Sequence, residues 1–226
     1  MNEKKSRGLF NRIAPVYGLF FSFQVETFRR ILDQVSSEVD LTGWESVIDV
    51  GCGTGALCSV LADRGMAVTG VEPAVKMLEI ARRKTAEHEA GENGVHELKK
   101  RPTLIEGDVL EGLPFPDKSF DVAITSYVAH GLQPEDRHKL YSEMSRVARE
   151  LVIVHDYNRE RSLMTSIAEW MEGGDYFRFI KIAEKEMADC RMESRISVAA
   201  ENKRCFSHVQ VLRVGPRASW YLCKPK

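Results

Sequence analysis

Val47-Ile48-Asp49-Val50-Gly51-Cys52-Gly53-Thr54-Gly55 is the stretch that decides the fold of this chain. A short apolar run that contains an acid leads into glycines at alternate positions. Glycine adopts positive φ values, and it has no Cβ to keep a ligand away from the backbone. The stretch therefore predicts a strand followed by a ligand-binding loop, with a helix beginning after Gly55.

Segments with strand and helix patterns alternate around this loop. Apolar runs predict strands over residues 46–50, 67–71, 103–106, 120–125 and 151–154. Helical patterns cover 25–39, 56–65, 74–81, 134–148, 163–171 and 176–187. The alternation predicts an α/β fold with a Rossmann-like, seven-stranded, mostly parallel sheet and helices on both faces. Residues 206–214 and 219–223 predict an antiparallel C-terminal hairpin.

The length and composition fit one domain. A chain of 226 residues with 43% hydrophobic residues can bury a substantial core. We expect a single domain, 1–226, that comprises an N-terminal helical cap or lid (1–40), a ligand-binding core (44–157), a helical insertion (158–190) and a C-terminal hairpin region (191–226). Phe10, Phe20, Phe21 and Phe23 in the cap either form an apolar lid over a hydrophobic ligand or pack on the edge of the sheet.

Charge and cysteine content argue against several classes of protein. A net charge of -1 provides no general attraction for nucleic acid. The 5 cysteines include no Cys-x-x-Cys pair, which disfavours a disulfide framework or a zinc site, so no metal is expected. No apolar run approaches the roughly 18–20 residues that span a bilayer, and Met1 to Arg7 is too polar for a secretion signal. We expect a cytoplasmic protein without a transmembrane segment.

The ends of the predicted strands carry the candidate functional residues. Ligands of open parallel sheets bind beyond the carboxyl ends of the strands. In chain order those ends are Asp49, Glu72, Asp108, Ser126 with Tyr127, and His155 with Asp156. Because acids stand at most of these ends, we expect them to converge on one crevice rather than to act as separate helix caps.

Two adenine-containing cofactors fit the glycine loop. Gly51, Gly53 and Ala56 formally match the G-x-G-x-x-G/A pattern of dinucleotide-binding proteins. A dinucleotide, however, brings a pyrophosphate to the helix N-terminus, whereas S-adenosylmethionine (SAM) brings an ammonium and a sulfonium, which suit Asp49. Glu72 can accept both ribose hydroxyls of either cofactor. Asp108 and the N–H of Val109 suit an adenine edge.

Residues 46–128 resemble the SAM-binding core of class I SAM-dependent methyltransferases that act on small molecules. The resemblance rests on the glycine loop, on Gly107-Asp108-Val109 and on the segment 113–122. It implies a cofactor-binding set, which the adjoining residues complete: Tyr17, Asp49, Gly51, Cys52, Gly53, Gly55, Glu72, Pro73, Met77, Asp108, Val109 and Ser126. We interpret Cys52 as a small residue beside the cofactor and not as a nucleophile.

The leader Phe10-Asn11-Arg12-Ile13-Ala14-Pro15-Val16-Tyr17 is similar to the N-terminus of ubiquinone and menaquinone biosynthesis methyltransferases. That similarity implies that Tyr17 closes over the methionine end of SAM. The chain departs from the pattern at Gly18, where those enzymes have aspartate, and it lacks their Lys-Pro-Gly-Gly turn before the fifth strand. The reaction class is therefore better supported than a quinone substrate.

The sequence thus predicts transfer of a methyl group to a small-molecule acceptor, preferably to carbon or oxygen, with a hydrophobic quinol or phenol among the candidates. A general base is needed only if the acceptor arrives protonated, and His130 and His155 are the candidates. The alternatives are an NAD-dependent oxidoreductase and a non-catalytic SAM-binding partner subunit. The oligomeric state is open.

Overall fold

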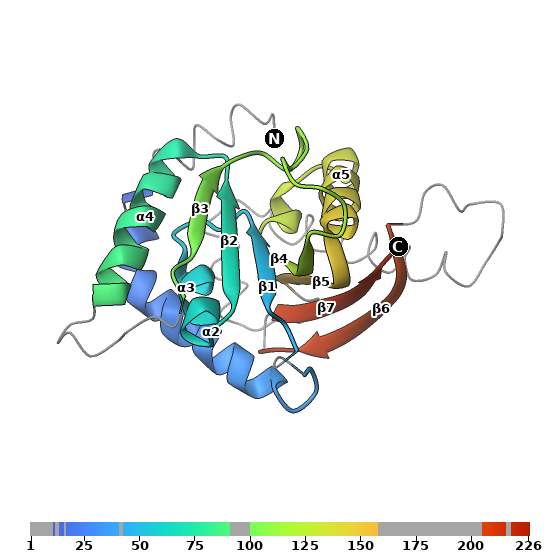
Figure 1. Cartoon of the computed structure of the whole chain (residues 1–226), viewed down its shortest axis with the longest axis horizontal. Helices are drawn as coiled ribbons and strands as arrows, with labels where there is room; N and C mark the ends of the chain where they lie inside the picture. Colours follow the sequence, from blue (N-terminus) through green and yellow to red (C-terminus); the bar gives the residue numbers. More distant parts are fainter. Residues whose placement is uncertain are drawn as a thin grey trace, which may run out of the picture.

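A seven-stranded sheet forms the centre of the molecule, in the order β3-β2-β1-β4-β5-β7-β6 (Figure 1). The computed structural model describes residues 11, 14–15, 17–40, 43–90, 100–157, 205–215 and 218–226. The strands are β1 (Ser46–Val50), β2 (Ala67–Glu72), β3 (Thr103–Glu106), β4 (Phe120–Ser126), β5 (Ala148–Tyr157), β6 (Phe206–Arg213) and β7 (Ala218–Pro225). Strands β1 to β5 are parallel, and β7 is antiparallel to both β5 and β6. The predicted Rossmann-like fold with a C-terminal hairpin is therefore confirmed.

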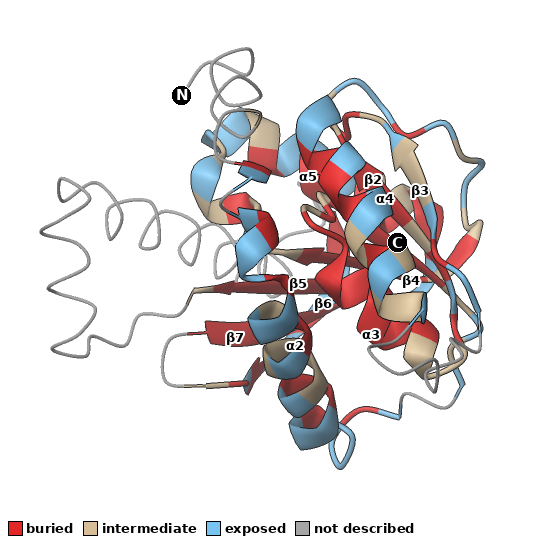
Figure 2. Ribbon diagram, turned by 90° about the vertical axis from the view of Figure 1, so that its left-hand side faces the viewer, coloured by how far each residue is buried: buried red, intermediate tan, exposed pale blue. Residues whose placement is uncertain are grey.

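Helices cover both faces of this sheet. They are α2 (Phe21–Val35), α3 (Ala56–Asp63), α4 (Val75–Ala90) and α5 (Pro134–Val147), with a short 3-10 helix η1 (Ala129–Gly131) before α5. One buried cluster joins α2 and α3 to the sheet through residues such as Val47, and another joins α5 to it through residues such as Ile48. Successive strand residues point to opposite faces, so the continuous apolar strands contribute to both clusters. Figure 2 shows that most of the central strands are buried.

The largest difference from the expected elements is the length of β5. The apolar pattern predicts a strand over 151–154, but β5 follows α5 directly and continues to Tyr157. The added residues are mostly polar and bear no strand signal of their own. They become a strand at its carboxyl end because β7 pairs with β5 from Val152 to Tyr157, in a register that aligns Asp156 with Ser219. This extension positions Asp156 and Tyr157 at the site described below.

The cap residues divide between core and solvent. Phe21 is buried and its ring meets His88 of α4 edge-on, whereas the side chains of Phe20 and Phe23 are exposed. Phe10 and the expected helices at 163–171 and 176–187 lie outside the described residues. Within the described ranges, no helix combines the length and apolarity needed to cross a bilayer.

Gly70 in β2 provides a test of how tightly the sheet packs on α3. A Cβ at this position would lie 2.7 Å from Leu104 Cδ2 and 2.8 Å from Cys58 Sγ. We expect Gly70→Ala to lower the free energy of unfolding by about 1–3 kcal/mol, because added atoms strain a packed interior. Urea denaturation followed by circular dichroism measures this loss. Gly215→Ala, where a Cβ meets no atom of the described part of the chain within 4 Å, is the control; an equal loss there would contradict the packing argument.

Candidate active site

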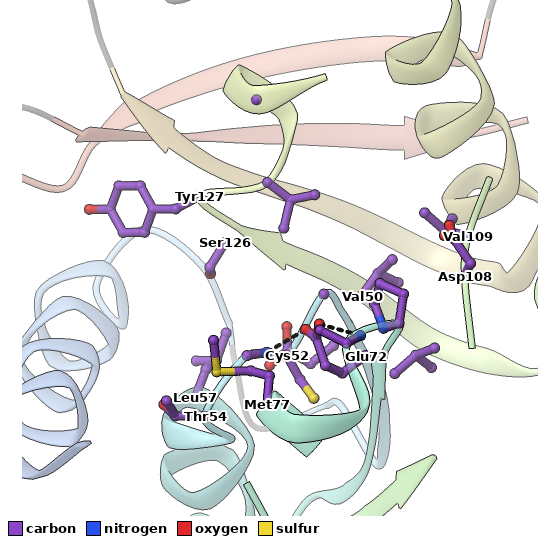
Figure 3. Close-up of a pocket in the computed structure, with 18 of the residues that line it drawn as sticks. Val50, Cys52, Thr54, Leu57, Glu72, Met77, Asp108, Val109, Ser126 and Tyr127 are labelled. Carbon is purple, nitrogen blue, oxygen red and sulfur yellow. Dashed lines mark hydrogen bonds between the residues drawn. The ribbon is translucent and has the colours of Figure 1, made fainter. Parts of the chain in front are cut away.

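A cavity of about 420 Å³ opens at the carboxyl ends of β1, β2 and β4 (Figure 3). Most of the residues predicted from the sequence line it: Tyr17, Asp49, Gly51, Cys52, Gly53, Glu72, Pro73, Met77, Asp108, Val109, Ser126 and His130. Gly55 and His155 do not. Asp156, the other acid expected at the strand ends, does not line the cavity either, so Asp49, Glu72 and Asp108 are the predicted acids that meet there.

The glycine loop is tied to β2 by the backbone. Gly51 N and Cys52 N both donate to Val71 O, at 2.8 and 3.0 Å, and Gly55 N donates to Cys52 O at 2.9 Å. Gly53 has φ of +54°, and among the described residues a Cβ there would meet no atom within 4 Å, so its bare backbone faces open space in the cavity wall. Gly55 plays a different part, because a Cβ there would lie 2.8 Å from Thr85 Cγ2. This glycine therefore lets α3 pack against α4.

The carboxylate of Glu72 spans the loop and the segment that leads into α4. Its Oε2 accepts from Gly53 N at 3.0 Å, and its Oε1 accepts from Ala74 N at 2.9 Å; both bonds are drawn in Figure 3. Burial raises the pKa of Glu72, and the two backbone N–H groups oppose that effect. Each carboxylate oxygen has about two acceptor sites, so Glu72 retains acceptor capacity toward the cavity it lines.

Asp49 is a nearly fully buried acid in the floor of this cavity. Its Oδ2 accepts the thiol of Cys58 at 3.3 Å, and its Oδ1 has no hydrogen-bond partner among the described residues. Burial raises the pKa of Asp49 to about 7, and the nearby charge of Glu72 adds to this effect. An incompletely satisfied buried carboxylate is costly, and a cation in the cavity would relieve that cost.

Asp108 closes the turn that follows β3. Its Oδ1 accepts from Leu110 N at 2.8 Å, and the side chain remains at the cavity wall next to Val109.

Aromatic rings form another part of the wall: Tyr127 and Tyr157 line the cavity with ring centroids 4.8 Å apart. Tyr127 adopts φ of +57° at the end of β4, and burial raises the pKa of its phenol, so it stays protonated.

The two candidate histidines have different environments. His155 is 1% exposed, contacts the ring of Tyr127, and lies 3.4 Å through Nδ1 from Ser126 Oγ. Burial lowers the pKa of His155 to about 4, so its ring is neutral at physiological pH. His130 lies on η1 and lines the cavity. His130 is therefore the histidine that a bound acceptor can reach.

Sequence reasoning missed the partner of His130. Asp156 accepts from the backbone N of His130 at 2.9 Å through Oδ2, and its Oδ1 lies 3.0 Å from Nδ1 of that ring. Asp156 follows His155 on β5 and therefore points to the opposite side of the strand. Nothing in the sequence of residues 129–131 indicates that His130 lies on that side. The wall also includes Gln24 and Phe28 from α2, and Gln24 accepts from Thr54 Oγ1 at 2.6 Å. Their sequence spacing shows only an amphipathic helix.

The known proteins that this chain resembles in sequence include several methyltransferases. Residues 48–153 match a family model described as a methyltransferase domain. Demethylmenaquinone methyltransferase of Tropheryma whipplei is 38% identical over 122 residues, which cover 52% of this chain and 44% of that protein. Malonyl-[acyl-carrier protein] O-methyltransferase of Serratia marcescens is 30% identical over 149 residues, with coverages of 66% and 50%. The chain thus spans about half the length of these curated relatives.

Solved structures share the fold. Mitomycin 7-O-methyltransferase superposes with a TM-score of 0.62 at 21% identity, covering 99% of this chain and 58% of that one. Magnesium protoporphyrin IX methyltransferase from Synechocystis, with bound SAH, gives 0.55 at 18% identity, with coverages of 89% and 83%. Residues 48–153 therefore resemble the methyltransferase domain of these relatives, and the fold is shared with methyltransferases of known structure. The Oδ1 of Asp49, which has no partner among the described residues, fits a cationic ligand such as SAM.

Asp49 should make stability depend on pH. Its folded pKa of about 7 exceeds the unfolded value of about 3.9, so the folded state binds the proton more tightly and loses stability as pH rises through that interval. We expect Asp49→Asn to be more stable than wild type at pH 8, by about 1–3 kcal/mol, and little different below about pH 4. Urea unfolding across this range measures the difference.

Asp121 supplies a control of opposite sign. Burial tends to raise its pKa, but the N–H and hydroxyl of Ser46 outweigh burial and lower it. Asp121→Asn should therefore lose stability at neutral pH. Equal responses of the two variants to pH would contradict the role assigned to Asp49.

Proposed function

We propose that this protein transfers the methyl group of SAM to a small-molecule acceptor, with carbon or oxygen as the receiving atom. The observation that carries the proposal is the combination in one cavity of a buried, incompletely paired acid, Asp49, with an accessible His130 held by Asp156. The first suits a cationic cofactor, and the second suits removal of a proton from an acceptor. The methyltransferase-domain match over 48–153 supports the same reaction.

The residues of the cavity fit SAM in distinct ways. Asp49 would balance the positive methionine end, Glu72 would accept the ribose hydroxyls, and Asp108 with Val109 would meet the adenine edge. SAM supplies a methyl group already activated on a sulfonium. The chain then has to hold the acceptor in line, exclude water and take up a proton where one is released.

The glycine loop argues against the rival dinucleotide cofactor. A pyrophosphate needs free backbone N–H groups at the start of the helix. In the loop that precedes α3, the N–H groups of Gly51 and Cys52 are bonded to Val71 O, and that of Gly53 is bonded to the carboxylate of Glu72, so this loop does not offer them to a phosphate. The carboxylates of Glu72 and Asp49 would in addition repel the pyrophosphate. NAD-dependent oxidation is therefore disfavoured by the same contacts that build the loop.

An aromatic, largely apolar acceptor suits the remainder of the wall. Phe28, Tyr127 and Tyr157 line the cavity, and the latter two are in ring contact. The relative from Tropheryma whipplei carries the name of a demethylmenaquinone methyltransferase. A hydrophobic quinol or phenol is therefore the acceptor class to test first.

Titration calorimetry with SAM, S-adenosylhomocysteine and NAD tests the cofactor. We expect binding of both adenosyl compounds and none of NAD. Glu72→Gln should weaken SAM binding about tenfold or more, because a hydrogen bond to a charged group contributes about 1.5–3 kcal/mol. Binding of NAD alone would overturn the proposal. Wild-type affinity in Glu72→Gln would remove this residue from the site.

Transfer itself is tested with methyl-labelled SAM and a panel of quinols, phenols and matching anilines. We expect label to enter the hydroxylated compounds, and His130→Ala to lower kcat by about 100-fold with SAM affinity unchanged. Tight SAM binding without turnover of any acceptor, together with stable association with another chain, would instead identify a non-catalytic partner subunit.

A further inference from the structure

The carboxylate of Asp156 accepts two backbone N–H groups and lies within hydrogen-bonding distance of one ring nitrogen, while it is almost completely buried. Its Oδ2 accepts from His130 N at 2.9 Å, and its Oδ1 accepts from Tyr157 N at 2.8 Å. The Nδ1 atom of His130 lies 3.0 Å from Oδ1. Only 1% of Asp156 is exposed, so these donors and not solvent determine its hydrogen bonding.

This arrangement decides which nitrogen of the neutral ring carries the proton. An ionised carboxylate only accepts hydrogen bonds, so Nδ1 must donate and therefore holds the hydrogen. Nε2 is then the basic nitrogen of the ring. Asp156 thus acts on His130 twice, since one oxygen fixes the backbone of η1 and the other fixes the ring.

The short helix that carries His130 is also held from its other side. Leu132 N donates to Ala129 O at 3.1 Å, and the buried guanidinium of Arg137 donates to Leu132 O. The ring of His130 meets Tyr157 edge-on, with centroids 4.9 Å apart. Strand β5 and helix α5 therefore both fix the position of the ring at the cavity wall.

We infer that Asp156 is a positioning residue, which holds His130 as the Nδ1–H tautomer so that Nε2 can take a proton from a hydroxyl or acidic C–H acceptor. This inference rests on the proposed function. The acceptor's proton passes to Nε2 while its freed electron pair forms the new bond to the methyl carbon. The sulfur–methyl bond breaks with its electron pair left on sulfur, giving S-adenosylhomocysteine. The imidazolium, paired with Asp156, then returns its proton to solvent.

The variant Asp156→Asn distinguishes control of the His130 tautomer from a role of Asp156 in packing. Its side chain keeps the shape of aspartate but has one acceptor oxygen for three donors. Its NH₂ group is itself a donor, which favours the opposite tautomer, with Nδ1 accepting and the proton on Nε2. In that tautomer Nε2 cannot act as a base.

The direct test is long-range ¹H–¹⁵N correlation on the full chain with ¹⁵N-labelled histidine, at about pH 8.5, where an unperturbed imidazole is neutral. The His130→Ala spectrum assigns the signals. We expect the Nδ1–H tautomer in wild type and a shift to Nε2–H in Asp156→Asn. A wild-type ring that is mainly Nε2–H overturns the inference, and this measurement needs no altered protein that could fail to fold.

Kinetics supplies the second readout. Asp156→Asn should lower kcat by about 100-fold, with the KM values for SAM and acceptor within about twofold of wild type. In a His130→Ala background, Asp156→Asn should lower kcat no further, because Asp156 acts only through the ring that is already absent. A further loss of equal size in that background would reduce Asp156 to a structural role.

Asp121→Asn is the matched control, since Asp121 also accepts backbone N–H groups but lies at the opposite end of β4. It should lose stability and keep kcat. Failure of the proposed function is distinguishable from failure of this inference: if no acceptor is methylated, the tautomer spectra still decide the role of Asp156.

Discussion

The bridge that Glu72 makes between Gly53 and Ala74 is the contact on which the rest of the site depends. It joins the loop after β1 to the end of β2 and the approach to α4 through a single carboxylate. With Gly51 and Cys52 bonded to Val71, the loop has a defined shape before any ligand arrives. The same bonds occupy the N–H groups of Gly51, Cys52 and Gly53, which could otherwise bind an anion. Glu72 therefore shapes the loop and also makes it less suited to a ligand with a phosphate group.

The buried carboxylate of Asp49 has an energetic cost for folding. A carboxylate nine residues from its thiol partner, buried beneath the loop with one oxygen unpaired among the described residues, does not favour folding. Strand β1 tolerates it because neighbouring residues Ile48 and Val50 are fully packed. A cation beside this carboxylate would turn an unfavourable electrostatic environment into a favourable one, so the cost of burying Asp49 would be recovered on binding.

The apolar runs of the sequence predict the sheet well because strands buried on both faces have few alternatives. Residues 46–50 form a strand as expected, and residues 120–125 lie within β4. The strand ends likewise predict the acids that line the cavity, since topology alone brings them together. Whether a strand-end side chain reaches the cavity or lies beneath other residues is not visible in the sequence pattern. His155 ends a strand as Asp49 does, yet it is covered by Tyr127 and Trp220 and does not line the cavity. The pairing of His130 with Asp156 joins segments 26 residues apart, and no local pattern encodes it.

Helix α2 reaches the loop as well as the acceptor wall. Gln24 accepts from Thr54 of the glycine loop, while Phe28, one turn along the same helix, lines the cavity and lies edge-on to His155. If an acceptor moved Phe28 by shifting α2, it would also move Gln24 relative to Thr54. The proposed cofactor and acceptor would then bind with linked affinities, and such linkage is reciprocal. A change of acceptor during evolution would in that case also change the affinity for the cofactor through this helix.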